Sequence, residues 1–153
     1  MKKILSLILI LGSVHLLAQE TPTRVQSEKR SALTVGVLKG GGSLIGADLE
    51  VLLTERMGIQ VGGGLVGFGA GLNFHYQPSI RSSFFSFQYW HQGIGSSFAQ
   101  SAFGPSFVYR GRKGLSAQIG FAVPLDEGPA LPREFADRHL MLTYALGIYL
   151  PLF

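Results

Sequence analysis

Two carboxylates, an imidazole and a guanidinium occupy polar positions within otherwise apolar segments of the chain. Asp48 and Glu50 are two residues apart within residues 45–53, so both project from one face if this segment is a strand. His75 and Arg110 hold comparable positions further along. These groups could perform acid–base chemistry or form a buried network of ion pairs and hydrogen bonds. We favour the structural network, because charged groups removed from water must find partners.

A serine-based hydrolytic site is the second chemistry that these residue types allow. Ser86, His75 and Glu50 would supply a nucleophile, a base and a carboxylate. A catalytic triad is recognised by its geometry, and no local motif in the sequence fixes a serine beside the histidine. A lipid-modifying enzyme is therefore kept as an alternative, and no residue is assigned a catalytic role.

No pattern in the sequence points to a metal ion or a cofactor. The four histidines are scattered, and the absence of cysteine excludes thiolate metal sites and disulfides. The glycines at residues 62–64 are not followed by the Lys-Ser/Thr pair of a phosphate-binding loop. His91 follows Tyr89 and Trp90, a pair that fits an aromatic belt at a membrane interface. We expect neither a cofactor nor a metal.

The elements that would position these side chains are short strands. From residue 32 onward apolar and polar positions alternate with a period of two, which is typical of strands. Within residues 115–125, for example, Ile119 shares an oily face whereas Gln118 lies on a polar or small one. Eight strands are predicted, at residues 32–39, 45–53, 58–66, 68–77, 83–92, 102–110, 115–125 and 140–152.

The connections between these strands indicate an orientation. An even number of strands places both ends of the barrel sequence on one side, and if that side is periplasmic, the short turns fall there. The two longest connections, residues 92–101 and 127–138, then fall outside. The turn between the third and fourth strands is expected near Gly67, with residues 62–64 as the alternative. Pro105 requires a bulge or a strand that starts at Ser106, because proline has no N–H to donate.

Composition favours a membrane barrel over a soluble sheet. Charged residues are 14% of the chain, against about 25% in soluble domains. The polar face of each predicted strand carries mostly Gly, Ser, Gln and Asn, which suit the crowded interior of a narrow barrel. Lipid also requires a closed sheet, because an open edge would leave backbone groups unpaired. We predict an all-β, antiparallel, up-and-down transmembrane β-barrel over residues 32–153.

Residues 1–18 have the three parts of a secretory signal peptide. Lys2 and Lys3 precede an apolar run that ends at Ala18. That run has about 15 residues, short of the roughly 20 that a spanning helix needs. Cleavage near Gln19 would leave a flexible polar segment over residues 19–31. It would also lower the formal charge from +4 to +2 by removing two lysines, and no basic cluster suggests nucleic-acid binding.

Residues 32–153 resemble the small eight-stranded outer-membrane β-barrel proteins of Gram-negative bacteria, in pattern rather than through a diagnostic motif. The most specific feature is the last strand, which ends in Phe153. In that family a terminal aromatic residue is recognised by the barrel-insertion machinery. Here Phe153 is out of phase with the apolar face of residues 146–152. The resemblance implies an outer-membrane location, with membrane lipid and the insertion machinery as partners.

Three functions are compatible with this sequence. The first is a non-enzymatic barrel with a structural, adhesive or narrow-pore role. The second is an enzyme that modifies outer-membrane lipid, and the third is a secreted lipocalin-like binder with its oily face turned inward. We expect the first, because eight strands leave an interior just wide enough for side chains to fill.

Overall fold

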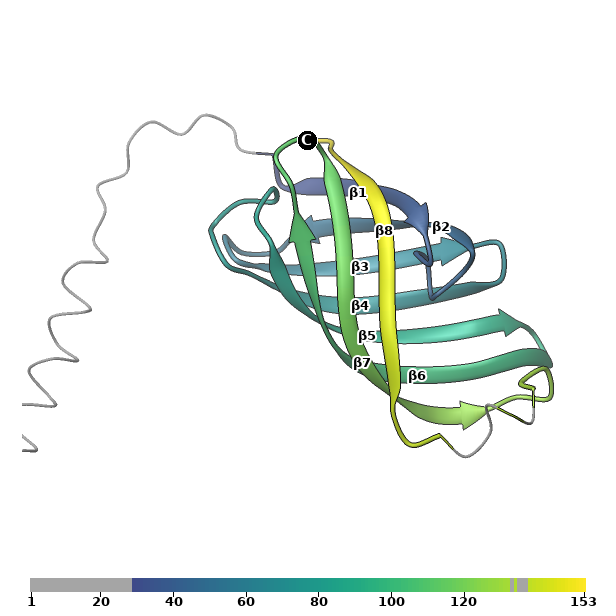
Figure 1. Ribbon diagram of the computed structural model, residues 1–153. Helices are drawn as coiled ribbons and strands as arrows, with labels where there is room; N and C mark the ends of the chain where they lie inside the picture. The colour runs from purple at the N-terminus through teal and green to yellow at the C-terminus, as the bar shows by residue number, and fades with distance from the viewer. Residues whose placement is uncertain (1–28, 133, 135–137) are drawn as a thin grey trace, which may run out of the picture.

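The computed structural model describes residues 29–132, 134 and 138–153 of the chain (Figure 1). The predicted signal peptide at residues 1–18 lies outside the described residues, as does most of the predicted flexible segment at residues 19–31. Among the described residues, no helix combines the length and the apolar character needed to cross a bilayer.

Eight antiparallel strands in chain order form a closed barrel, in which β8 pairs with β1. This confirms the predicted all-β, eight-stranded, up-and-down architecture. The strands are β1 Ser31–Val37, β2 Ile45–Leu52, β3 Met57–Gly64, β4 Gly67–His75, β5 Phe84–Ile94, β6 Ser97–Arg110, β7 Leu115–Glu127 and β8 Met141–Pro151.

The barrel has two ends, called here the terminal end and the mouth end. The terminal end contains the start of β1, the end of β8 and the turns at residues 53–56, 76–83 and 111–114. Figure 1 shows the C-terminus beside the start of β1 at this end. At the mouth end lie the connections at residues 38–44, 65–66 and 95–96 and the longer β7–β8 connection.

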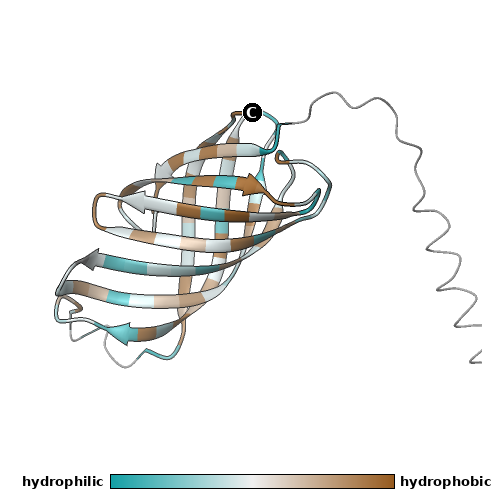
Figure 2. Cartoon of the chain, turned by 180° about the vertical axis from the view of Figure 1, so that it is seen from behind, coloured by the Kyte–Doolittle hydropathy of each residue, from teal (hydrophilic) through white to brown (hydrophobic). Residues whose placement is uncertain are grey.

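The alternation predicted from the sequence separates the two faces of the strands. In β7, Ile119 is 56% exposed on the outside, whereas its neighbour Gln118 is 6% exposed and points into the lumen. Hydrophobic and hydrophilic bands accordingly alternate along the strands (Figure 2). The large apolar side chains therefore lie mainly outside the barrel, and its interior is mainly polar or small.

Glycines allow neighbouring strands of the barrel wall to approach each other closely. Gly36 of β1 pairs with Gly46 of β2 on one side and with Gly147 of β8 on the other. A Cβ atom at Gly36 would lie 2.0 Å from the carbonyl oxygen of Leu146. Any other residue would push β1 and β8 apart at this point, so the abundance of glycine reflects close backbone approach.

The two halves of the barrel differ in length. β1–β4 have seven to nine residues, whereas β5–β8 have eleven to fourteen. The predicted long loop at residues 92–101 is wrong, because β5 and β6 continue to a turn at Gly95 and Ser96. A bulge between Gln92 and Gly93 and the positive φ of 60° at Gly95 accommodate that hairpin. Of the two long mouth connections that were predicted, only the β7–β8 connection is long in the structure.

At three further strand boundaries the structure corrects the prediction or decides between its alternatives. The β3–β4 turn is formed by Leu65 and Val66 rather than by residues 62–64. Ser31, assigned to the flexible segment, begins β1 and donates its hydroxyl to the carbonyl of Phe153 at 3.1 Å. β6 runs without a break through Pro105, and its pairing with β7 skips that residue and Gly104. The missing N–H of proline is thus accommodated by an open step in the ladder.

Candidate functional site

Three of the four predicted polar residues meet inside the terminal end of the lumen. Glu50 projects from β2, His75 from β4 and Arg110 from β6. His75 Nε2 lies 2.9 Å from Glu50 Oε1, and Arg110 Nη2 lies 2.7 Å from Glu50 Oε2. Each carboxylate oxygen of Glu50 therefore has its own partner, and all three side chains are sealed from solvent.

Aromatic and aliphatic groups close this end around Arg110. Its guanidinium lies 4.9 Å from the ring centre of Phe84 and 4.8 Å from that of Tyr149. It also donates to the carbonyl of Ile80, which is fully buried in the β4–β5 connection. The cation is thus held between two rings and a carboxylate, an arrangement that stabilises a desolvated arginine.

Neutral polar side chains extend the Glu50 cluster across the lumen. Asn73 donates its amide to Glu50 and to Gln60 Oε1, the latter at 3.1 Å. Ser86, considered above as a nucleophile, donates to Asn73 Oδ1 at 2.5 Å rather than to His75. Asn73 and Gln60 were not predicted to join this network, although both stand on the polar faces of their strands.

A different serine lies beside the histidine. Ser82 Oγ is 3.4 Å from His75 Nδ1, so Ser82, His75 and Glu50 form a line of the residue types found in hydrolytic triads. The hydroxyl of Ser82 is also engaged by its own loop, accepting from Gln77 N at 3.1 Å and donating to Ser83 O at 2.9 Å. The ring of His75 is fully buried. This line of contacts orders the β4–β5 connection, and Ser82, which is half-buried, also lines a cavity on the outer side of the barrel.

Asp48, the fourth predicted residue, belongs to a separate pair nearer the mouth end. Its partner is Lys39, at 3.6 Å, from the connection at residues 38–44. Lys39 Nζ also donates to Gln118 Oε1 at 2.8 Å, and Gly40 N donates to Asp48 Oδ1 at 3.0 Å. Burial lowers the pKa of Lys39 below the usual range of a lysine, and the charge of Asp48 opposes part of that shift.

The glycines of the connection at residues 38–44 carry Lys39 into the lumen. Gly40, Gly41 and Gly42 have φ values of 63°, 80° and 75°, a region that glycine adopts without strain. A Cβ atom at Gly41 would lie 2.2 Å from the carbonyl oxygen of Phe68. This glycine run therefore matters for the site. No role was predicted for it, because a connection is expected to face solvent.

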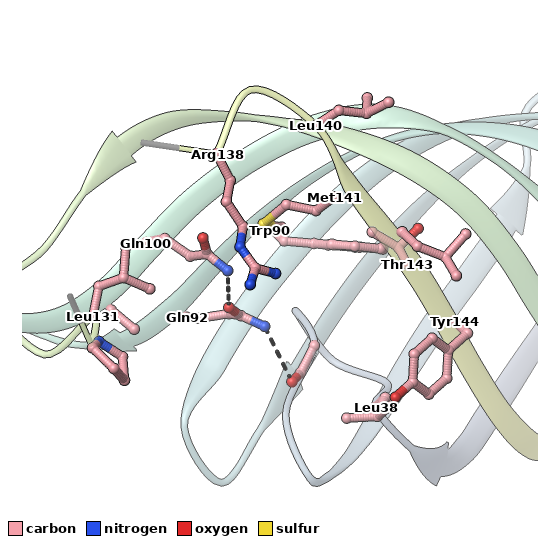
Figure 3. Close-up of a pocket in the computed structure, with 14 residues that line it drawn as sticks. Leu38, Trp90, Gln92, Gln100, Leu131, Arg138, Leu140, Met141, Thr143 and Tyr144 are labelled. Carbon is pink, nitrogen blue, oxygen red and sulfur yellow. Dashed lines mark hydrogen bonds between the residues drawn. The ribbon is translucent and has the colours of Figure 1, made fainter. Parts of the chain in front are cut away.

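A cavity of about 520 Å³ opens at the mouth end (Figure 3). Trp90, Gln92, Gln100 and Thr143 contribute to its lining. Gln100 Nε2 donates to Gln92 Oε1 at 2.8 Å, and Gln92 Nε2 donates to the carbonyl of Gly42 at 3.4 Å, as the dashed lines show. Amides, an indole and the guanidinium of Arg138 among aliphatic side chains supply hydrogen bonds and apolar contacts, and these lining residues include no carboxylate.

Side chains fill the lumen between the mouth cavity and the Glu50 cluster. Gln118 Nε2 donates to Gln88 Oε1 at 2.8 Å and to Ser106 Oγ at 3.3 Å, next to the Lys39–Asp48 pair. All of these side chains are buried. Within the described ranges, no group of three histidine, aspartate or glutamate side chains is placed to hold a metal ion.

Comparisons of this chain with models of protein families, with curated protein sequences and with solved structures gave no match.

Proposed function

We propose that this chain is an integral outer-membrane β-barrel protein with a structural or adhesive role, and that its lumen is closed to solutes. The observation that carries the proposal is the outward-facing surface. Large apolar side chains project from every strand of the closed barrel, at exposures that a soluble protein rarely maintains over so wide an area. They include Val35, Leu49, Val61, Leu72, Phe87, Phe103, Ile119 and Leu146.

The position of the charges supports the same proposal. Histidine apart, the acidic and basic residues within the strands are Asp48, Glu50 and Arg110, which face the lumen, and Asp126 and Glu127 at the mouth end of β7. The lipid-facing positions of the strands thus avoid the groups that are most costly in a bilayer.

The shorter half of the barrel also presents an extended apolar surface. Leu44, Leu53, Leu65 and Val66 lie just beyond the ends of β2 and β3 and are more than half exposed. They extend the exposed apolar surface beyond the ends of the strands. A lipocalin-like binder would need these side chains turned inward, and a narrow pore would need an open path through the interior, so both alternatives are disfavoured.

The proposal includes export and insertion. The signal peptide predicted at residues 1–18 would direct the chain across the inner membrane, and the last strand, which leads to Phe153, would engage the insertion machinery. Outer-membrane lipid is then the solvent of the outward face. Lipid modification by the Ser82–His75–Glu50 line is disfavoured because the imidazole is sealed.

The sharpest test compares two adjacent positions of β7. Ile119→Arg places a charge on the proposed lipid face and should cost roughly 2–4 kcal/mol if it lies near mid-membrane, which should greatly reduce folding into liposomes. Gln118→Glu keeps the size of a lumen residue and should retain most of the folding yield. Protease resistance and heat-modifiable gel migration measure the yield. Normal folding of Ile119→Arg together with failure of Gln118→Glu would contradict the membrane assignment.

A further inference from the structure

Cationic side chains gather outside the lumen at the terminal end. Among the described residues, Glu55 is the only acidic side chain there, whereas at the mouth end Asp126, Glu127 and Glu134 outnumber Arg138. The barrel is therefore electrically asymmetric along its axis. The exposed cations of the terminal end are Lys29, Arg30, Arg56, Arg81, Arg112 and Lys113.

Two of these cations share a cavity of about 550 Å³ on the outer side of the barrel. Arg81 comes from the β4–β5 connection and Arg112 from the β6–β7 turn, and both line the cavity. Arg110 also contributes to the wall, but its guanidinium is committed to Glu50 inside the lumen. The exposed guanidinium groups of Arg81 and Arg112 are therefore the ones available to a ligand.

The same cavity continues onto the apolar outer surface. Phe85 of β5 and Phe107 of β6 line it, with their ring centres 5.2 Å apart. Their exposures of 58% and 37% place both rings on the outward face of the barrel. A ligand that fills this cavity would meet cationic groups at the rim and aromatic surface next to them, towards the middle of the barrel wall.

We propose that this cavity binds an anionic phospholipid, with Arg81 and Arg112 donating hydrogen bonds to the phosphate oxygens. Guanidinium groups match phosphate geometry and bind it through charge-assisted hydrogen bonds. The first methylenes of the acyl chains would contact Phe85 and Phe107. This inference rests on the proposed function, since acyl chains reach these rings only when the barrel lies in a bilayer.

The aromatic surface distinguishes a lipid from a free phosphate ion. Inorganic phosphate would use the two arginines and gain nothing from Phe85 and Phe107. A phospholipid uses both parts of the cavity at once, and an anionic headgroup adds long-range attraction to the cationic rim. Phosphatidylglycerol should therefore bind better than phosphatidylcholine, which has the same phosphate but no net charge.

Native mass spectrometry of the folded full-length protein, purified from mixed phosphatidylglycerol and phosphatidylcholine vesicles, tests this proposal. The parent should retain phosphatidylglycerol preferentially. The double variant Arg81→Gln/Arg112→Gln should lose about tenfold or more in retention, because each arginine contributes a charge-assisted hydrogen bond. Arg81→Gln alone should lose part of it. Arg56→Gln, at the same end but outside the cavity, should behave like the parent.

Several outcomes would overturn the proposal. They are equal retention of the two lipids by the parent, unchanged retention by the double variant, and complete displacement of the lipid by an equal concentration of inorganic phosphate. Heat-modifiable migration in vesicles is measured in parallel. A parent that does not fold into bilayers refutes the proposed function, whereas a parent that folds but shows no lipid preference refutes this inference alone.

Discussion

The two charged clusters of the lumen use similar groups but are held in different ways. Glu50, His75 and Arg110 project from three strands, each of which is hydrogen-bonded to a neighbour on both sides. Lys39 instead projects from a glycine-rich connection and reaches Asp48 at 3.6 Å, against 2.7 Å for Arg110 and Glu50. The strand-held cluster is closed over by Ile80, whereas the connection that carries Lys39 lies at the mouth.

This difference bears on how each pair responds to the loss of a partner. A buried charge that cannot move is left without compensation when its counter-charge is removed. A charged side chain on a connection at the barrel mouth can turn towards water, and it then loses only its local hydrogen bonds. The terminal cluster should therefore behave as a rigid part of the fold, and the Lys39–Asp48 pair as an adjustable one.

The largest effect is expected from Glu50→Gln. This change leaves the guanidinium of Arg110 buried between Phe84 and Tyr149 without a carboxylate, which should cost about 3–5 kcal/mol of unfolding free energy. Urea titration of the protein folded in vesicles, followed by heat-modifiable migration, measures the loss. Glu55→Gln, on an exposed turn at the same end, should stay within about 0.5 kcal/mol of the parent.

A second variant separates the effect of the uncompensated charge of Arg110 from the effect of losing the ion pair. Adding Arg110→Met to Glu50→Gln removes the uncompensated charge and should restore part of the lost stability, because apolar replacements of buried ion pairs are often tolerated. If Glu50→Gln matches Glu55→Gln in the titration, the terminal cluster is not the rigid element described above.

A smaller effect is expected from Asp48→Asn. Lys39 loses its counter-charge but keeps Gln118 Oε1 as an acceptor and can shift towards the mouth, so the cost should be about 1–2 kcal/mol. The same urea titration applies, and Lys39→Met provides the reciprocal variant. A loss as large as that of Glu50→Gln would show that the connection at residues 38–44 is as rigid as the strands.

The smallest effect concerns conductance. The Gln118–Gln88 contacts and both charged clusters cross the lumen, so planar-bilayer recordings of the parent should show little or no current. Lys39→Ala should add at most small steps, because the Glu50 cluster still closes the terminal end. Large porin-like steps in the parent would contradict a filled lumen.

The sequence by itself determined the architecture and the two faces of the strands. Both depend on a period-two alternation that is local, since neighbouring side chains on a strand point to opposite sides whatever the strand pairs with. That is why Ile119 could be assigned outward and Gln118 inward without a structure. The same pattern marked Asp48, Glu50, His75 and Arg110 as lumen residues.

Only the tertiary structure decided which of these residues meet. The partners of Glu50 lie 25 and 60 residues away in sequence, and strand register, which no local pattern fixes, brings them together. Lys39, the last residue of the predicted strand at residues 32–39, was missed because its entry into the lumen depends on how residues 40–44 fold, and Ser82 because its place beside His75 depends on how the β4–β5 connection folds. Residues 92–101 looked like a loop by composition. They form a hairpin because the pairing of β5 with β6 supplies hydrogen-bond partners that the sequence alone cannot specify.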